Sequence, residues 1–287
     1  MEIRAANQSE LASVFATVHE AWPHHEDLNT HVSRRLASPQ HQYATWYVVK
    51  IKDRIAASLG AYPMSFQAGG RVINGIAIGA VFTVKSQRKQ GLAFKLIEQV
   101  HLRAQEQGAT VSLLFSDISP AYYEKLGYHQ VPMFHGQEAA TSHDRLLIQS
   151  RPIDEFPRET KGVEQAHILH TNSHWQWLQK RHQGLEHYVV TDGSSILASF
   201  MTGFYEGRTW VLRWHQLSLN PQALKLALEH LAAHLDQPQV DYWWSGPLPE
   251  PSSLNLASPQ AEIPMICSLD GEQYHHHKWQ LEAIDHV

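Results

Sequence analysis

A short basic loop with a single glycine is the part of the sequence best suited to bind a charged ligand. The loop Lys85-Ser86-Gln87-Arg88-Lys89-Gln90-Gly91 follows an apolar run that ends at Val84 and precedes a stretch with helical apolar spacing. At the start of a helix, unpaired N–H groups and the helix dipole favour anions, and glycine lets a ligand approach the backbone closely. The loop is therefore predicted to bind phosphate groups.

Two common phosphate-binding patterns do not occur in this loop. A P-loop needs G-x-x-x-x-G-K-[ST], and neither Gly79-Ala80 nor Gly91-Leu92 is followed by lysine and a hydroxyl residue. The dinucleotide pattern G-x-G-x-x-G is missing too. The pattern that is present is Arg88-x-x-Gly91-x-Ala93, directly after an apolar strand. The backbone N–H groups of residues 87–93 suit a diphosphate.

A second motif, Tyr122-Tyr123-Glu124-Lys125-Leu126-Gly127-Tyr128, follows farther along the chain. Together the two motifs resemble the pyrophosphate loop R/Q-x-x-G-x-G/A and the "YEKLGF" segment of the GNAT (GCN5-related N-acetyltransferase) superfamily. The resemblance in order, spacing and element type covers residues 1–151. The alternative is a strand–helix–strand core with a solvated basic turn.

The resemblance implies that acetyl-CoA is a co-substrate held by the basic loop and the strand before it. Ser116 stands where many family members have asparagine. The residues that the resemblance assigns to acetyl-CoA binding are Phe82, Thr83, Val84, Gln87, Arg88, Lys89, Gln90, Gly91, Leu92, Ala93, Ser116 and Tyr123.

The resemblance also implies direct attack of an amine on the acetyl thioester, which lies between two splayed strands at about 79–84 and 110–115. A backbone N–H near Val84 is expected to stabilise the oxyanion. Tyr123 is expected to protonate the departing thiolate, as a phenol of pKa ~10 can do for a thiolate whose conjugate acid has a pKa of ~8.5. The alternative for Tyr123 is a half-buried aromatic that packs the last helix.

The general base is not identified by the sequence, because the strand before the basic loop contains no carboxylate. An alkyl ammonium must lose a proton before it attacks, so a base or a water chain is needed. Candidates are His25, Glu26, Asp27 and Asp117, each of which also reads as solvated surface. The expected acceptor is a primary amine of a small molecule or peptide, drawn by Glu20, Glu26 and Asp27.

Alternating strands and helices in residues 1–151 predict an α/β fold with a mixed (α+β) sheet. The apolar positions Ala93, Leu96, Ile97, Val100 and Ala104 predict a helix that ends near 107. Strands are expected at 1–5, 44–50, 54–63, 75–84 and 110–115, with a closing hairpin at 128–135 and 144–150. Polar residues 151–162 are expected to be a linker.

Residues 163–287 repeat this pattern in a weaker form and predict a second, degenerate GNAT-like domain. Between Trp214 and Pro221 there is no Arg-x-x-Gly pattern and no basic cluster. The layout is similar to the second, cofactor-free domain of Eis-type acetyltransferases. The tryptophans Trp210, Trp214, Trp243 and Trp244 are expected in the core or at a domain interface.

Composition limits the class of protein. The chain has 287 residues, of which 43% are hydrophobic and 18% charged, which is typical of globular proteins. No apolar run is long enough for a membrane span, and the net charge of −5 argues against nucleic-acid binding. No signal peptide is expected, because residues 1–10, MEIRAANQSE, carry charges where a signal peptide needs its apolar core. A cytoplasmic protein, possibly a homo-oligomer, is expected.

One cysteine, Cys267, and 21 histidines without zinc-like spacing predict no metal site. Two alternatives to an enzyme are a non-catalytic acyl-CoA-binding sensor or scaffold, and an interaction protein.

Overall fold

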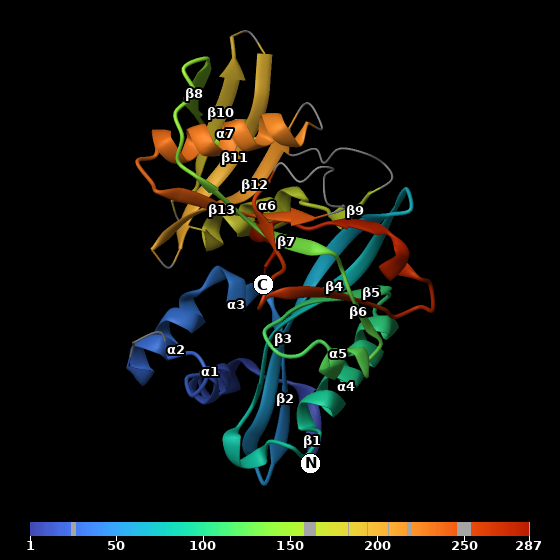
Figure 1. Cartoon of the computed structure of the whole chain (residues 1–287). Coiled ribbons are helices and arrows are strands. Elements are labelled where there is room, and N and C mark those ends of the chain that lie inside the picture. Colours follow the sequence, from blue (N-terminus) through green and yellow to red (C-terminus); the bar gives the residue numbers. More distant parts are fainter. Residues whose placement is uncertain are drawn as a thin grey trace. The chain divides into compact units, whose positions relative to one another are not determined.

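The computed structural model describes residues 1–23, 27–157, 165–182, 184–193, 195–205, 207–216, 220–245 and 254–286 (Figure 1). The chain divides into two compact units, and each is described by itself. The first unit comprises Met1–Val131 and Ile263–His277. The second comprises Pro132–Glu262 and Lys278–His286. Each unit is built on a mixed β-sheet with helices, as the α/β prediction required.

The sheet of the first unit has the strand order β1-β2-β3-β4-β5-β15-β6. All neighbours in this order are antiparallel except β4 and β5, which are parallel. The strands are β1 (Glu2–Ala5), β2 (Thr45–Ile51), β3 (Arg54–Ala68), β4 (Arg71–Thr83), β5 (Val111–Ser116), β6 (Tyr128–Gln130) and β15 (Ile263–Ser268). The helices are η1 (Gln8–Glu10), α1 (Leu11–Val18), α2 (Leu28–Ala37), α3 (Pro39–Tyr43), η2 (Lys85–Gln87), α4 (Leu92–Glu106), α5 (Ala121–Glu124) and η4 (Tyr274–His276).

Helix α4 connects the two parallel strands and lies against the sheet (Figure 1). Its apolar stripe is buried at Leu96, Ile97, Val100 and Ala104, as predicted from the spacing. These side chains join a core that includes Leu59, Leu114 and Tyr128. Because the stripe fixes which face of α4 is turned inward, it also fixes the direction in which the basic loop before the helix presents its backbone.

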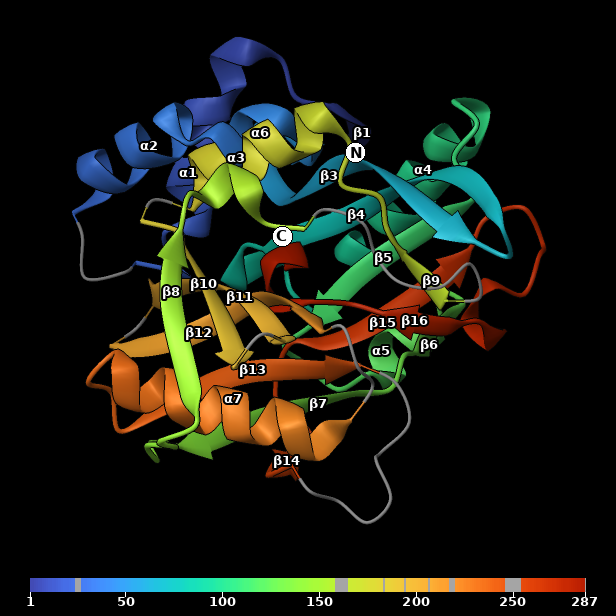
Figure 2. The ribbon, with the colours of Figure 1, turned by 90° about the horizontal axis from the view of Figure 1, so that it is seen from above.

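The sheet of the second unit has the strand order β14-β7-β13-β12-β11-β10-β8, in which only β12 and β13 are parallel. Helix α7 packs on one face of this sheet (Figure 2). Its Leu224, Leu228 and Leu231 are fully buried against Phe200 and Tyr242. The strands are β7 (Met133–Ala139), β8 (Leu146–Arg151), β10 (Glu186–Asp192), β11 (Ser195–Tyr205), β12 (Arg208–Gln216), β13 (Gln239–Ser245) and β14 (Leu256–Ala257). Further elements are η3 (Ile153–Glu155), β9 (Gln165–Ile168), α6 (Asn172–Arg181), α7 (Pro221–His234), β16 (Lys278–Gln280) and η5 (Ala283–Asp285).

Strand pairing divides the chain differently from the predicted ranges 1–151 and 163–287. The expected hairpin of β7 and β8 does not form, because β7 pairs with β13 and β8 pairs with β10, both in the second sheet. The place beside β5 and β6 in the first sheet is taken by β15, from the C-terminal part of the chain. Alternation of apolar residues shows that a strand has a buried face, but it does not show which edge the strand joins.

The stretch expected to be a linker is partly anchored. Its described residues, 151–157, include η3 and Phe156, which is 2% exposed. Phe156 lies 6.5 Å from the Trp175 ring and 5.3 Å from the His187 ring, centroid to centroid. One buried aromatic therefore fixes this segment in the second unit.

Candidate functional site

Strands β4 and β5 part at the end of the sheet that carries the basic loop. Their pairing ends at Ile78 and Leu114, although β4 continues to Thr83 and β5 to Ser116. The register of β4 against β3 passes from Gly79–Gly60 to Phe82–Ser58, so Ala80 and Val81 stand opposite a single residue. This β-bulge, in which Ala80 has φ 49°, bends β4 away from its neighbour. The splay expected from the resemblance is present.

The basic loop places an open helix start beside this gap. After η2 the backbone passes through positive φ at Lys89 (64°) and Gly91 (71°), and Gly91 is the N-cap of α4 without any side-chain cap. Among the described residues no acceptor pairs with the N–H groups of Leu92 and Ala93. A Cβ built on Gly91 meets nothing within 4 Å. Open space, free donors and the helix dipole together form a cradle for an anion.

Arg88 ties the loop to the end of β4. Its Nε donates to the Thr83 carbonyl oxygen at 3.0 Å, and its Nη2 lies 3.4 Å from the Glu20 carboxylate. The guanidinium carbon is 5.8 Å from the centroid of the Phe82 ring. The Arg88 side chain is nevertheless 50% exposed, so an arriving anion can compete with Glu20 for it.

The oxyanion donor predicted near Val84 needs correction. The Val84 N–H donates to the Ala56 carbonyl oxygen at 3.0 Å and is therefore engaged in the sheet. The bulge at Ala80 and Val81 lies where the β5-facing edge of β4 has no strand partner beyond Ile78 in the described residues. A motif locates the end of a strand, but it does not reveal a bulge within it.

Ser116 is buried and engaged locally. Its hydroxyl donates to the Ile118 carbonyl oxygen at 2.8 Å, and its Oγ lies 3.3 Å from the Ile118 nitrogen. Serine competes in this way for nearby backbone groups at the ends of strands. The side chain predicted to contact CoA thus holds the turn after β5.

Tyr123 lies on α5 with its ring 7% exposed. The rings of Tyr122 and Tyr128 pack edge-on against it, with centroid distances of 5.0 and 5.9 Å. Among the described residues none makes a hydrogen bond with the Tyr123 hydroxyl. Burial, with smaller effects of Tyr122 and Asp117, raises the pKa of Tyr123 to about 12, so the phenol is protonated at neutral pH.

A buried hydrogen-bonded cluster next to Tyr123 was not predicted from the sequence. The Tyr128 hydroxyl lies 2.9 Å from His101 Nε2 and 2.6 Å from Ser112 Oγ. Burial lowers the pKa of His101 to about 4, so its imidazole is neutral. These bonds fix the Tyr128 ring on which Tyr123 rests. Two sequence features could have indicated this cluster: Ser112 lies inside an apolar strand, and His101 lies beside the apolar stripe of α4.

Two of the four candidate general bases lie within the described residues. His25 and Glu26 lie outside the described residues. Asp27 caps α2, because its carboxylate accepts from the N–H groups of Asn29 and Thr30 and from the Thr30 hydroxyl at 2.5 Å. These hydrogen bonds, chiefly those of Thr30, lower the pKa of Asp27, so the carboxylate acts as a helix cap. Asp117 stays a candidate near Tyr123, whose pKa its charge raises.

The described residues contain neither a metal-binding cluster nor a membrane-spanning helix. No group of three or more His, Cys, Asp or Glu side chains within them could hold a metal ion. Within the same residues no helix combines the length and apolar character needed to cross a membrane.

Comparisons with known proteins connect this geometry to a family. Residues 2–131 match the Acetyltransferase (GNAT) domain family. No curated protein matches the sequence.

Among solved structures, a probable N-acyltransferase from Enterococcus faecalis V583 superposes with a TM-score of 0.67 at 12% identity, over 94% of this chain and 73% of that chain. A GCN5-related N-acetyltransferase from Anabaena variabilis gives 0.66 at 18% identity over the same shares. Eis1 from Mycobacterium abscessus gives 0.59 at 12% identity, over 94% of this chain and 74% of that chain. These likenesses show the fold of both units, and residues 2–131 of this chain are similar to the GNAT acetyltransferase domain family.

Proposed function

We propose that the first unit transfers the acetyl group of acetyl-CoA to the nitrogen of a primary amine on a small molecule or peptide. The observation that carries this proposal is the gap between β4 and β5 with the open start of α4 beside it. The match of residues 2–131 to the GNAT domain family supports acetyl transfer in general. The identity of the donor and the nature of the acceptor are part of the proposal.

The basic loop fits the diphosphate of coenzyme A. The N–H groups of Leu92 and Ala93 have no acceptor among the described residues, and the space over the Gly91 Cα is open. Lys85, Arg88 and Lys89 supply positive charge. The neighbouring Gln87 and Gln90 extend the same polar rim. Phe82 and Thr83 belong to the part of β4 that has parted from β5, where the pantetheine arm has a backbone edge to follow.

In the transfer step the amine nitrogen forms a bond to the acetyl carbon and the carbon–sulfur bond breaks. Negative charge develops first on the carbonyl oxygen, where the bulge at Ala80 and Val81 can offer backbone N–H groups. The nitrogen loses one proton, and the thiolate gains one as it leaves. Proton balance is therefore closed without a covalent enzyme intermediate.

Tyr123 assists the departure of the thiolate by donating a hydrogen bond. Complete transfer of its proton is costly, because its pKa of about 12 exceeds the thiol value of ~8.5 and each pKa unit is worth about 1.4 kcal/mol. The gap corresponds to about 5 kcal/mol. The raised pKa therefore favours a phenol that remains a donor while charge accumulates on sulfur, with the amine as the final source of the proton.

The test is release of free thiol from acetyl-CoA across a panel of primary amines, with acetyl-CoA binding measured separately by calorimetry. An acetyltransferase releases thiol at a rate that depends on the amine. Binding of acetyl-CoA without amine-dependent thiol release would instead favour the non-catalytic acyl-CoA sensor. Absence of binding would contradict both functions.

A further inference from the structure

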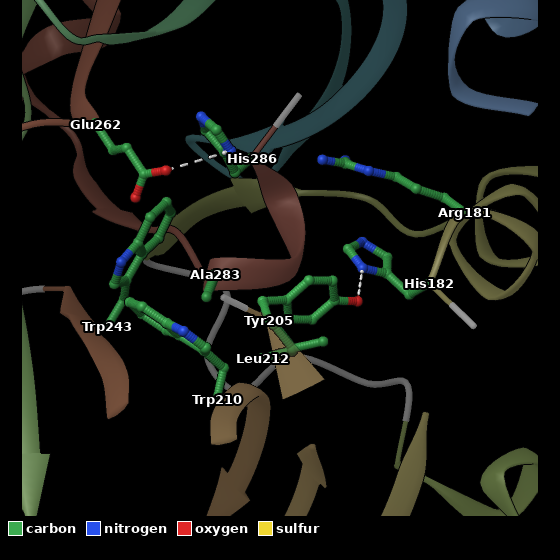
Figure 3. A pocket seen from close by; sticks show the side chains of 9 residues that line it. All are labelled: Arg181, His182, Tyr205, Trp210, Leu212, Trp243, Glu262, Ala283 and His286. Carbon is green, nitrogen blue, oxygen red and sulfur yellow. Dashed lines mark hydrogen bonds and ion pairs between the residues drawn. The ribbon is translucent and has the colours of Figure 1, made fainter. Parts of the chain in front are cut away.

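The second unit contains a cavity of about 300 Å³ that plays no part in the proposed acetyl transfer (Figure 3). Its lining comes from the end of α6, from β11, β12 and β13, and from the C-terminal η5. Aromatic rings form one side of the cavity and ionisable groups form the other.

The aromatic side is formed by Trp210, Trp243 and Tyr205. The register of β12 against β11 skips Leu212, and this bulge gives Trp210 and Trp214 different surroundings. Trp214 stacks on Trp244, with ring centroids 5.7 Å apart and planes 8° apart, against the core of the unit. Trp210 is partly buried, stacks on the His135 ring with centroids 5.1 Å and planes 9° apart, and also lines the cavity.

A glycine makes room for the Tyr205 ring. A Cβ on Gly203 would stand 2.8 Å from Tyr205 Cε2 and 2.9 Å from Leu212 Cδ1, closer than real side chains allow. The absence of that side chain lets Tyr205 and Leu212 occupy the wall beside Trp210. The cavity wall is therefore built by a specific choice of residue.

An unpaired nitrogen lies at the polar side. His182 is 7% exposed, its Nδ1 is hydrogen-bonded to the Tyr205 hydroxyl, and its Nε2 has no partner among the described residues. Burial, then the charge of Arg181, lowers the pKa of His182 to about 3, and burial raises the pKa of Tyr205. The neutral imidazole therefore accepts from the phenol at Nδ1 and carries its proton on Nε2. Leaving a buried N–H donor without an acceptor is costly, and an acceptor group on a ligand would remove that cost.

Arg181 supplies a positive charge next to this donor. After burial, which is the larger cause, the charge of Arg181 lowers the pKa of both His182 and His286. Figure 3 shows the Arg181 side chain extending from α6 toward His286. Glu262, the acidic lining residue, lies on the Trp243 side with its Oε1 3.7 Å from His286 Nδ1. A cation, Arg181, and a neutral donor, His182, thus both line the cavity.

We propose that this cavity binds a small planar aromatic molecule that carries a carboxylate. The ring lies among Trp210, Trp243 and Tyr205, and the carboxylate accepts from His182 Nε2 and pairs with Arg181. A cationic amine in the same place would leave the His182 donor unsatisfied and would face Arg181. An aliphatic acid would lose the stacking on the aromatic wall.

Calorimetric titration of the full chain with indole-3-acetate tests the proposal, with indole, tryptamine and hexanoate as matched comparators. We expect one indole-3-acetate per chain with a Kd on the order of 0.1 mM, at least about tenfold weaker binding of indole and hexanoate, and no binding of tryptamine. Equal affinity for indole-3-acetate and tryptamine, or no binding of indole-3-acetate at millimolar concentration, would overturn it.

Variants assign the binding to this cavity. Arg181→Gln should weaken indole-3-acetate at least about tenfold and leave indole within about twofold. Arg151→Gln, on the exposed part of β8 in the same unit, is the matched control and should change neither. Because Arg181 also packs over Trp177 at 5.5 Å, a thermal melt accompanies each variant. If Arg181→Gln does not fold, Trp210→Leu is the second test. It should weaken the binding of indole and of indole-3-acetate alike, and unchanged affinity for both would refute the site.

Discussion

Gly91 offers a sharp test of the anion cradle, because a matched glycine lies at the other end of the same helix. Gly91 (φ +71°) precedes α4 and Gly108 (φ +85°) follows it, and a Cβ on either meets nothing within 4 Å. Replacing either glycine with glutamate therefore adds the same charge and a similar backbone strain, about 1 kcal/mol. Only the Gly91 substitution places that charge at the proposed diphosphate site.

The magnitude follows from Coulomb's law. At about 6 Å, two unit charges repel by about 0.7 kcal/mol in water and by about 2.8 kcal/mol at an effective dielectric constant of about 20. A diphosphate carries about two negative charges, so the total lies between about 1.4 and 5.5 kcal/mol. The lower bound corresponds to about a tenfold weaker affinity. The steric obstruction over Gly91 adds to it.

The assay is calorimetric titration of coenzyme A into wild type, Gly91→Glu and Gly108→Glu, each checked by urea unfolding. We expect Gly91→Glu to weaken coenzyme A at least about tenfold, and less so as salt screens the repulsion. Gly108→Glu should bind coenzyme A like wild type, with a similar loss of stability. Affinities of the two variants within twofold of each other would refute the cradle at the start of α4.

Three further predictions concern the first unit's chemistry and the protein's stability. Tyr123→Phe should lower kcat by roughly 10²-fold and leave the Kd for acetyl-CoA unchanged in pre-steady-state assays; unaltered turnover with chemistry limiting would reduce Tyr123 to packing. Asp27→Ala should lower the urea midpoint, because α2 loses its N-cap, without changing the pH profile of kcat. A change in the pH profile would instead restore Asp27 as a candidate base. Acid should destabilise the fold, because burial lowers the pKa of His101 to about 4 and of His182 to about 3, below the unfolded value of ~6.5. The unfolded chain binds more protons in that window, so stability falls as pH drops from about 6.5 toward 4. An unchanged urea midpoint between pH 7 and pH 5 would contradict this.

The parts of the site that the sequence predicts are local. The apolar stripe of α4, the glycine before it and the Arg-x-x-Gly-x-Ala pattern lie within twenty residues, and the structure places them as a loop and helix between two parallel strands. Local spacing determines such an element because the helical period of 3.6 residues is a property of the backbone.

The parts that escape prediction depend on distant partners. Strand β15 pairs with β5, and strand β7 pairs with β13. Both pairings join segments far apart in the sequence, so local spacing does not predict them. The engagement of the Val84 N–H by Ala56 and of the Ser116 hydroxyl by Ile118 depends on a bulge and a turn that no motif encodes. The pKa of Tyr123 depends on burial, which assembles from several elements.

The most direct test of the central claim is to follow a labelled acetyl group from acetyl-CoA by rapid quench and mass spectrometry in the presence of a primary amine that supports thiol release. We predict that the label appears on the amine nitrogen at the rate of thiol release and that the protein never carries it. Thiol release without a labelled amine, or a labelled protein that forms before the product, would contradict direct transfer in the first unit.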